Sequence, residues 1–346
     1  MTTSTDELTA QARAFRDKHG VPGIAAAIVT TEGLETTAVG VRVRGGAEPV
    51  GRDDKWHIGS CCKSMTAVLF ARLVDSGKAA WQGTVADLLR DTNPHPAWGE
   101  VTITDLLTHF AGLPANLTQA ARKAAYADTD PGPVQRTETA ARALSGPPVK
   151  YGQFLYSNLG YTLAGAAIER IGEVSYEDAL RREVLEPLGM SSAGFGAPTG
   201  EAPWGHPPRW LLYGKGKAVD PTNMSPPRPA DNPSVMTPAG RLHVSLADWA
   251  RFIRLFLAGG GDLLTADSLQ RITTPPAGRQ SSQGMGWALP VSDRSRIAYA
   301  QQGSNLRWVA TAVVDRDRRK SVLIATNDGR LRLLRPSLDL GIKLLG

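Results

Sequence analysis

The sequence predicts an α+β protein whose antiparallel sheet is built from both ends of the chain, with flanking helices and an inserted, mostly helical region. Strand-like apolar runs occur between residues 21 and 43 and return between residues 284 and 329. The intervening residues 84–260 carry mostly helical patterns, which Pro/Gly loops interrupt. Strands so far apart share one sheet only if the two ends of the chain come together.

The length of the chain sets its organisation. At roughly 100–200 residues a domain, 346 residues suggest about two structural units. We expect a sheet domain formed by residues 1–80 and 275–346, and an inserted helical domain formed by residues 81–274. Apolar residues make up 42% of the chain and charged residues 21%, a globular composition that excludes collagen-like, coiled-coil and largely disordered classes.

The N-terminal elements follow from local patterns. Residues 7–18 place apolar side chains at helical spacing. Residues 21–33 predict a buried strand that ends in a turn, and residues 34–43 predict its antiparallel neighbour. Residues 57–78 predict the strongest helix of the chain, which begins at the Gly-Ser pair that contains Ser60.

The later elements alternate between helices and loops before the strands return. Helices are expected over residues 104–108, 160–171, 176–184 and 246–258. Residues 197–238 hold ten prolines, so we expect a long irregular segment of the kind that often forms a binding surface or a lid. Strands are expected over residues 284–291, 296–303, 307–315 and 321–328, and a last helix over residues 331–345.

Charge and cysteine content exclude several function classes. The net charge is +6, but the densest basic run, residues 315–320, lies between two predicted strands and predicts a hairpin turn rather than a nucleic-acid surface. No stretch approaches the roughly 18 apolar residues of a membrane span, and the N-terminus lacks the apolar region of a secretory signal. Cys61 and Cys62 are neighbours, too close for an ordinary disulfide, so a reducing, cytoplasmic location is expected.

Ser60 and Lys63 carry the first chemical signal. Residues three apart on a helix share a face, and Ser60 lies at the helix start, beside unpaired N–H groups, where a capping residue is found. A serine is a weak nucleophile until a base takes its proton, and a lysine can be that base where burial and the helix dipole depress its pKa. Taken alone, the motif is more often a capping serine beside a surface lysine.

Further segments give this motif a context. Residues 154–170, FLYSNLGYTLAGAAIER, carry Tyr156 and Asn158 as Tyr-x-Asn, and residues 301–305 read QQGSN between two predicted strands. Together with HIGSCCKSMTAVLFARLVDSGK, VTITDLLTHFAGLP, LEPLGM and TPAGRLHVSLADWARFIRLFLAGG, they make the chain resemble the serine β-lactamase and penicillin-binding-protein superfamily. The resemblance covers most of residues 20–330 and is strongest to the class C β-lactamase-like group, which includes family VIII esterases, D-aminopeptidases and acyltransferases.

The resemblance implies a role for each matching side chain. It implies that Ser60 is the acylated nucleophile, that Lys63 is its proton partner, and that Tyr156 is the general base or acid that contacts Ser60 and later the leaving group. It also implies that Asn158 anchors Lys63 and the acyl amide or ester of the substrate. A lysine ammonium near Tyr156 would favour the phenolate form of the tyrosine.

The predicted strand that ends at Ser304 supplies the remaining parts of the implied site and one departure from the family. The N–H groups of Ser60 and Ser304 are expected to form the oxyanion hole, and Gly303 lets the strand pass close to the substrate. The family usually has a cationic or imidazole residue where this chain has Gln301. A neutral amide holds a carboxylate poorly, so β-lactams and peptidoglycan stems become poorer candidates unless Arg307 supplies the charge from the next strand.

Other sites have less support. Cys61 and Cys62 point about 100° and 200° away from Ser60 on a helix, so we expect them to pack beneath the site rather than to act as nucleophiles. His109 is expected to be a structural hydrogen-bonding residue. The chain has no GxSxG, HExxH, P-loop or GxGxxG motif and no histidines at metal-ligand spacing, so we expect neither a metal nor a cofactor.

We therefore expect a serine hydrolase or acyltransferase for a neutral ester, thioester or amide of a small molecule, for example in secondary metabolism. The acyl group would pass to water, as in an esterase, or to an amine or alcohol, as in a transacylase. Trp204, Trp210 and Arg307 are candidates for the acceptor pocket, although the tryptophans would serve equally as anchors of the irregular segment. The alternatives are a β-lactamase, a D-aminopeptidase-type peptidase, and a catalytically silent binding protein of the same fold.

Overall fold

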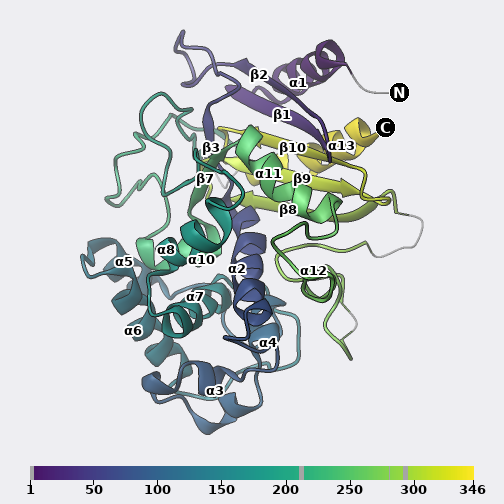
Figure 1. Cartoon of the computed structure of the whole chain (residues 1–346). Coiled ribbons are helices and arrows are strands. Elements are labelled where there is room, and N and C mark those ends of the chain that lie inside the picture. Colours follow the sequence, from purple (N-terminus) through teal and green to yellow (C-terminus); the bar gives the residue numbers. More distant parts are fainter. Residues whose placement is uncertain (1–3, 210–213, 280, 291–294) are drawn as a thin grey trace.

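A five-stranded antiparallel sheet with the order β2-β1-β10-β9-β8 lies in the upper half of the protein as drawn in Figure 1. The structure is a computed structural model that describes residues 4–209, 214–279, 281–290 and 295–346. The strands are β1 (Gly23–Thr30), β2 (Leu34–Gly40), β8 (Ile297–Ser304), β9 (Val309–Asp315) and β10 (Lys320–Thr326). Because β1 pairs along its length with β10, the predicted α+β fold with a sheet built from both chain ends is confirmed.

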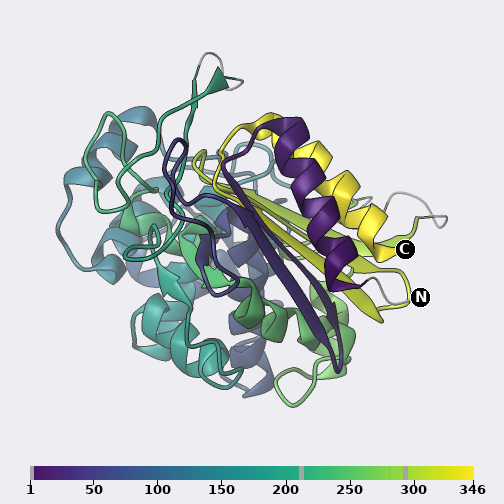
Figure 2. The same ribbon diagram turned by 90° about the horizontal axis from the view of Figure 1, so that it is seen from above.

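Side chains alternate between the two faces of this sheet, and helices cover both faces. Ile24 and its alternate neighbours on β1 pack against α1 (Thr5–His19) and α13 (Leu334–Leu345). Figure 2 shows these two helices side by side over that face. Ala25 and its alternate neighbours belong to the main core, which includes the apolar side of α11 (Leu246–Leu257). The sheet is therefore buried on both sides and holds its edges rigidly.

A mostly helical region lies beside the sheet. Its centre is α2 (Lys63–Asp75), which is buried almost all round, including the polar side chains of Lys63, Ser64 and Thr66. The other helices here are α3 (Val85–Leu88), α4 (Ile103–Leu107), α5 (Gln119–Ala127), α6 (Gly132–Leu144), α7 (Asn158–Gly172), α8 (Tyr176–Leu180), α10 (Thr237–Gly240) and α12 (Ala266–Ile272). Single turns are η1 (Gly59–Cys62), η2 (Arg90–Thr92), η3 (Pro96–Gly99), the π turn η4 (Arg181–Leu185), η5 (Ser234–Met236) and η6 (Leu331–Leu333).

Two small sheets complete the described elements. One has the order β3-β7-β4, with β3 (Lys55–His57), β7 (Leu242–Ser245) and β4 (Gly194–Phe195). The other pairs β5 (Pro208–Arg209) with β6 (Gly214–Lys215). Because β3 leads directly into η1, its pairing with β7 fixes the position of the turn that carries Ser60.

Three sequence predictions need correction. In their described part, residues 284–291 form no regular strand, and Ala288 makes only isolated bridges. The physical reason is that Gly286, with φ 79°, passes close to the backbone of α2. The predicted helix 57–78 is divided into the end of β3, η1 and α2. Ser60 lies inside η1, whose N-cap is Ile58, so Ser60 is not a capping residue.

Other local predictions agree with the structure. Residues 315–320 form the turn between β9 and β10, as the alternation of apolar and charged residues indicated. The division of the chain at residues 81 and 274 stays a prediction. Within the described ranges, no helix has the length and apolar character needed to cross a membrane.

Candidate active site

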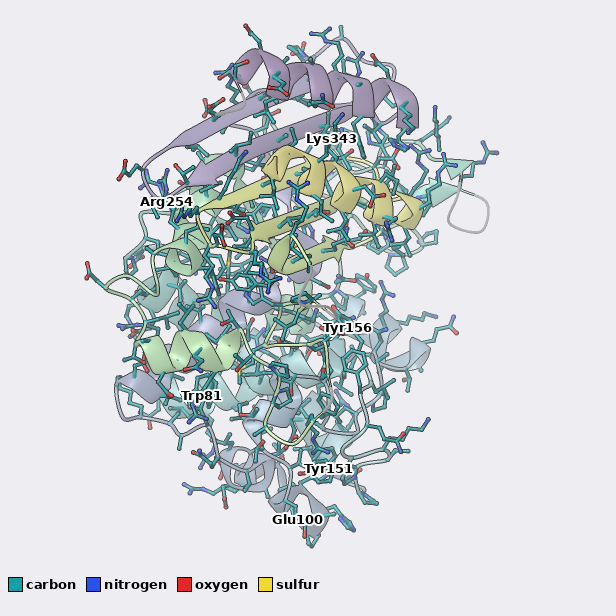
Figure 3. The ribbon with its side chains drawn as sticks, turned by 90° about the vertical axis from the view of Figure 1, so that its right-hand side faces the viewer. Trp81, Glu100, Tyr151, Tyr156, Arg254 and Lys343 are labelled. Atoms are coloured by element: carbon teal, nitrogen blue, oxygen red, sulfur yellow. The ribbon has the colours of Figure 1, made fainter. Side chains whose placement is uncertain are left out.

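Ser60 lies on η1, between the end of β3 and the start of α2. Tyr156 approaches it from the loop before α7 and lies between the sheet and the helices below it (Figure 3). Gly59, with φ 53°, makes the sharp change of direction from the strand into the turn, a conformation that favours glycine. The nucleophile candidate is thus held at the junction of the sheet and the helical region.

The structure brings together the polar side chains that the sequence singled out. Lys63 Nζ lies 3.1 Å from Ser60 Oγ, and the hydroxyl of Tyr156 lies 2.9 Å from the same oxygen. Lys63 Nζ also donates to Asn158 Oδ1 at 2.7 Å and to the carbonyl of Ala239. Lys63 is 1% exposed, whereas Tyr156 is 40% exposed. A buried amine and an accessible phenol therefore meet at one serine oxygen.

The partners of Lys63 accommodate both of its protonation states. The carbonyl oxygens of Asn158 and Ala239 can only accept hydrogen bonds. An ammonium would donate to these two oxygens and to Ser60 Oγ, whereas a neutral amine would donate to the two carbonyls and turn its lone pair to the Ser60 hydroxyl. The same three contacts thus allow Lys63 to hold a proton or to receive one from Ser60.

His109 supports the loop that carries Tyr156. Its Nδ1 accepts a hydrogen bond from the backbone N–H of Ser157 at 3.1 Å, and its ring lies 4.5 Å from the Tyr156 ring. Burial, with the nearby charge of Lys63, lowers the pKa of His109 to about 3. The imidazole is therefore neutral and acts as a fixed backbone acceptor, which agrees with the structural role indicated by the sequence.

The turn at Ser60 and the end of β8 approach backbone to backbone. A Cβ atom at Gly303 would collide with the carbonyl oxygen of Ile58 and lie 2.6 Å from Ser60 N. A Cβ atom at Gly59 would lie 2.5 Å from Ser304 N. Only glycine at both positions permits this approach, which brings the N–H regions of Ser60 and Ser304 together, as an oxyanion hole requires.

Two cavities open at Ser60. The polar cavity, of about 180 Å³, is lined by Ser60, Asn116, Leu117, Arg122, Asn158, Asn232, Met236, Ala239, Gly240, Ser304, Asn305 and Leu306. The apolar cavity, of about 330 Å³, is lined by Ser60, Lys63, His109, Phe154, Tyr156, Gln283, Gly286, Ala288, Ala300, Gln301, Gln302 and Leu338. A substrate can therefore extend from Ser60 in two directions.

Gln301 lines the apolar cavity with a neutral amide, and Lys63 is the cation among the described residues that line the same cavity. Gln301 is 4% exposed, and its Oε1 accepts a hydrogen bond from Ser64 Oγ at 3.1 Å. Its buried Nε2 has no hydrogen-bond partner among the described residues. Arg307 lines a different cavity and so does not replace the missing cation beside Gln301.

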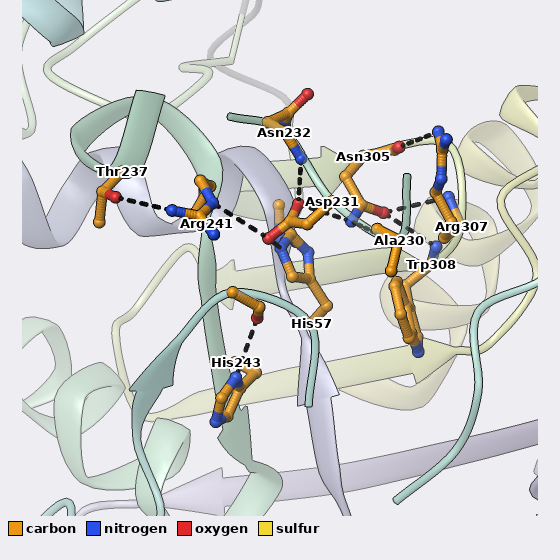
Figure 4. A network of polar contacts seen from close by, with 12 residues as sticks. His57, Ala230, Asp231, Asn232, Thr237, Arg241, His243, Asn305, Arg307 and Trp308 are labelled. Atoms are coloured by element: carbon orange, nitrogen blue, oxygen red, sulfur yellow. Dashed lines mark hydrogen bonds and ion pairs between the residues drawn. The ribbon is translucent and has the colours of Figure 1, made fainter. Parts of the chain in front are cut away.

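The structure adds a buried polar network that the sequence did not reveal (Figure 4). His57 Nδ1 accepts a hydrogen bond from the N–H of Gly59 at 3.1 Å, so its Nε2 carries the proton and donates to Asp231 Oδ2 at 3.0 Å. Asp231 Oδ1 accepts from Asn305 Nδ2 at 2.9 Å, and Arg241 Nε lies 3.5 Å from Asp231 Oδ2. The network ties the turn before Ser60 to the segment after Ser304.

The charge on Asp231 is stable despite its burial. Burial raises its pKa, but His57, Arg241 and Asn305 more than offset this and lower the pKa to about 2. His57, three positions before Ser60, was visible in the sequence, but its partner Asp231 lies 174 positions away. No local pattern could have paired the two residues.

The cysteines are free and pack beneath the site. Burial raises the pKa of Cys61 well above its ordinary value and raises that of Cys62 to about 11. Both thiols therefore stay protonated at neutral pH, which agrees with the packing role that their helical direction predicted.

The candidates for the acceptor pocket do not gather at Ser60. Trp204 is not among the described residues that line either cavity, and its backbone N–H donates to the carbonyl of Arg42. Trp210 lies outside the described residues. The described residues contain no group of three or more His, Cys, Asp or Glu side chains placed to hold a metal ion.

Comparison with known proteins places this fold and geometry in a known class, the serine hydrolases of the β-lactamase and penicillin-binding-protein fold. The sequence model of the Beta-lactamase family matches residues 8–340, and the chain belongs to that family.

Relatives of known name differ in length. The chain is 28% identical over 296 residues to penicillin-binding protein 4 of Amycolatopsis lactamdurans, covering 80% of this chain and 73% of that protein. It is 25% identical over 249 residues to the unguisins hydrolase ungD of Aspergillus violaceofuscus, covering 68% of this chain but 42% of that protein. The chain thus spans less than half the length of this hydrolase.

Solved structures share the fold. A class C β-lactamase superposes with a TM-score of 0.78 at 18% identity, covering 99% of this chain and 95% of the other. The D-amino acid amidase of Ochrobactrum anthropi superposes with a TM-score of 0.76 at 19% identity, covering 98% and 97%. These identities establish a common fold and leave the substrate to be argued from the site.

Proposed function

We propose that this protein forms an acyl-enzyme at Ser60 from a neutral ester, thioester or amide and then passes the acyl group to water or to a small amine or alcohol. The observation that carries the proposal is the meeting of Lys63 Nζ and the Tyr156 hydroxyl at Ser60 Oγ, at 3.1 and 2.9 Å. A hydroxyl with two groups able to move its proton is an activated nucleophile.

Acylation follows from these contacts. Lys63 as a neutral amine, or Tyr156 as a phenolate, takes the Ser60 proton while Ser60 Oγ bonds to the carbonyl carbon. The N–H groups of Ser60 and Ser304 stabilise the negative charge on the carbonyl oxygen. When the tetrahedral intermediate collapses, the bond to the leaving group breaks, and Tyr156, which is exposed to the cavity, delivers a proton to that group.

Gln301 supports a substrate that is neutral at the reacting end. Gln301 lies at the wall of the apolar cavity, where a cation would attract a carboxylate, and its buried Nε2 has no hydrogen-bond partner among the described residues. An N–H donor suits an ester or amide oxygen, whereas a carboxylate beside Gln301 would lose its hydration and meet a neutral amide. Lys63, the cation among the described lining residues, already contacts Ser60, Asn158 and Ala239. A β-lactamase or a D-aminopeptidase-type peptidase remains the second candidate, because named relatives include a penicillin-binding protein and a neighbour of the same fold is a D-amino acid amidase.

The test of the nucleophile is covalent labelling. A fluorophosphonate probe should add its mass to the wild-type protein and not to Ser60→Ala, as read by intact-protein mass spectrometry. Cys61→Ala is the matched control, because Cys61 is the next residue of the same turn and is buried. No labelling of the wild type would support the silent binding protein instead, whereas labelling of Ser60→Ala at the wild-type rate would show that another residue is the nucleophile.

The acceptor is tested by partition. A p-nitrophenyl ester is supplied together with millimolar primary amines, and the ratio of amide to acid is measured by mass spectrometry. Amide formation requires that a bound amine outcompetes water, which only a high effective concentration at the site achieves. Acid as the sole product across the panel identifies an esterase, whereas a shift toward acid in Trp204→Ala or Trp210→Ala would return these residues to the acceptor site.

The place of action is also part of the proposal. Two neighbouring free thiols, both buried, are compatible with work in the reducing cytoplasm.

A further inference from the structure

A third cavity lies beside the site and is lined by cations. It has a volume of about 600 Å³, and its charged lining residues are Arg209, Lys215, Lys217, Arg228 and Arg307, with no Asp or Glu among the described lining residues. We call it the basic cavity. β5 and β6 form part of its wall, and Leu306 and Arg307, just beyond the end of β8, form another part. Five positive charges around one concavity oppose one another unless an anion lies between them.

Three of these cations, Lys217, Arg228 and Arg307, lack acidic partners in the described part of the chain. Elsewhere buried arginines are paired: Arg136, for example, contacts both Glu169 and Glu177. By contrast, Lys217, Arg228 and Arg307 have no carboxylate within ion-pair distance among the described residues. None of these three charges is therefore neutralised by a direct ion pair with the described protein.

The guanidinium of Arg307 has few hydrogen-bond partners among the described residues. Its Nε is buried and has no hydrogen-bond partner among the described atoms, and its Nη1 donates only to the carbonyl of Asn305. Burial is the largest cause that lowers the pKa of Arg307, and it outweighs the opposite effects of Tyr126 and Asp231. A guanidinium has five N–H donors, and the Nη donors that the described contacts leave unused are available to a bound ligand.

The basic cavity adjoins the active site. Leu306 lines both the basic cavity and the polar cavity that opens at Ser60. Its φ of 66° is unusual for a residue with a side chain, and its N–H is held by Ser304 Oγ at 2.9 Å. The same short segment that ends β8 at the proposed oxyanion hole thus forms the boundary between the two cavities.

We propose that the basic cavity is a subsite for a phosphate-bearing part of the substrate, remote from the carbonyl that Ser60 attacks. This inference rests on the proposed function, since it extends the same site. A phosphate group carries up to two negative charges and three acceptor oxygens, which suits a set of lysine and arginine donors better than a single carboxylate does. The cations line a concavity rather than an open face, so the ligand is a small molecule that reaches from Ser60 past Leu306.

The subsite is tested by direct binding, without turnover. Pyrophosphate is titrated calorimetrically into the wild-type protein and into Lys217→Gln/Arg228→Gln at low ionic strength, where exposed charges are least screened. Each lost cation should weaken binding roughly tenfold, so the double variant should lose about 100-fold. Lys78→Gln/Arg13→Gln removes two exposed cations that do not line the cavity and should bind pyrophosphate as the wild type does.

Three outcomes decide the proposal. Equal weakening in the cavity variant and in the control variant would show only general attraction to a basic protein and would overturn it. Citrate that binds as tightly as pyrophosphate, with the same loss in the variant, would also overturn it, because the site would then favour carboxylates. Arg307→Gln, checked for folding by its thermal midpoint, should lose roughly tenfold as well, and unchanged binding in that folded variant would contradict the assignment.

Failure of the subsite and failure of the proposed function remain distinguishable. Ser60→Ala should bind pyrophosphate as tightly as the wild type, because Ser60 does not line the basic cavity. Pyrophosphate binding without covalent labelling at Ser60 would refute the acyl-enzyme and leave the subsite standing. Labelling at Ser60 without pyrophosphate binding would refute the subsite and leave the acyl-enzyme standing.

Discussion

At the scale of single residues, the proposed chemistry takes place at one oxygen atom, Ser60 Oγ, which both Lys63 and Tyr156 contact. Lys63, Tyr156 and the hydroxyl itself form a group in which each proton position depends on the others. Lys63 Nζ also lies 5.1 Å from the centre of the Tyr156 ring, so the amine and the phenol are close to each other as well as to Ser60. Groups that share protons in this way act as a unit, and their individual contributions are not additive.

Removal of either proton carrier should slow acylation severely. Tyr156→Phe and Lys63→Ala are each expected to reduce the single-turnover acylation rate by roughly 10²–10⁴, the usual range for general acid–base catalysis. The double variant should be little slower than the worse single variant, because the first substitution already disables the unit. A double variant whose loss equals the product of the two single losses would contradict the coupling of the two groups.

The resemblance to a known family predicted this group, and the two short motifs that carry the resemblance are visible in the sequence. Ser60 and Lys63 are three positions apart, and Tyr156 and Asn158 are two positions apart, so each pair is visible as local spacing. The role of Ser60 as a helix cap was predicted wrongly, because the chain enters α2 through a separate 3-10 turn. Ser60→Ala should therefore leave the free energy of unfolding nearly unchanged.

At the scale of secondary-structure elements, the His57–Asp231 network fixes the relative position of three segments. It joins β3 and η1 to the loop before η5 and to the residues after β8, all within the buried interior. His57 also stacks on Trp308, with ring centres 5.5 Å apart. Because the N–H of Gly59 donates to His57, the turn that carries Ser60 depends on this network for its geometry.

Loss of the Asp231 carboxylate should destabilise the fold and the site together. Asp231→Ala leaves His57, Arg241 and Asn305 without their buried partner, so we expect it to lower the free energy of unfolding by about 3–5 kcal/mol, as measured in urea. It should also slow covalent labelling of Ser60 in the protein that remains folded, because the Gly59 turn loses its support.

Asp231→Asn is the matched control for the shape of the side chain. Its amide oxygen can still accept from His57, so both stability and labelling rate should lie between those of the wild type and Asp231→Ala. An Asp231→Ala protein as stable as the wild type would show that the network is not a structural support.

Helices and strands were predicted well where local periodicity determines their structure, and poorly where contacts with distant residues determine it. The predicted helix over residues 246–258 corresponds to α11, whose apolar stripe is evident in the sequence. Residues 284–291 looked like a strand, but Gly286 serves a close approach to α2 that no local pattern records. The pairing of His57 with Asp231 likewise depends on tertiary structure.

At the scale of the whole molecule, buried neutral histidines link folding to pH. Burial is the largest cause that lowers the pKa of His109 to about 3 and of His206 and His243 to about 4. In the unfolded chain each would titrate near 6.5, so the unfolded state binds more protons than the folded state below that pH. The stability that these residues contribute is therefore full above about pH 6.5 and falls as the pH is lowered toward 4.

Acid should lower the free energy of unfolding of the protein at pH values above those at which its carboxylates titrate. Between pH 7.5 and 5.5 each histidine should lower the free energy of unfolding by about 1.4 kcal/mol, or about 4 kcal/mol for the three. Urea unfolding across this range measures the change. In His243→Gln, the dependence of the free energy of unfolding on pH should correspond to about one proton fewer taken up on unfolding, because glutamine does not titrate. The amide N–H of the new side chain can replace the ring N–H that donates to the carbonyl of Gly196. A flat profile would contradict the neutral state of these histidines.

The pairing of β1 with β10 has a consequence for synthesis of the chain. About 290 residues separate the end of β1 from the start of β10, so at 5–20 residues per second β1 leaves the ribosome roughly 15–60 s before its partner. During that interval one edge of an apolar strand is open to wrong pairing. Lys343 Nζ donates to Gln11 Oε1, and both chain ends lie on the same side of the molecule (Figure 2). A circular permutant that joins these ends and places β10 just before β1 should shorten the interval and give a larger soluble yield at the same rate of expression.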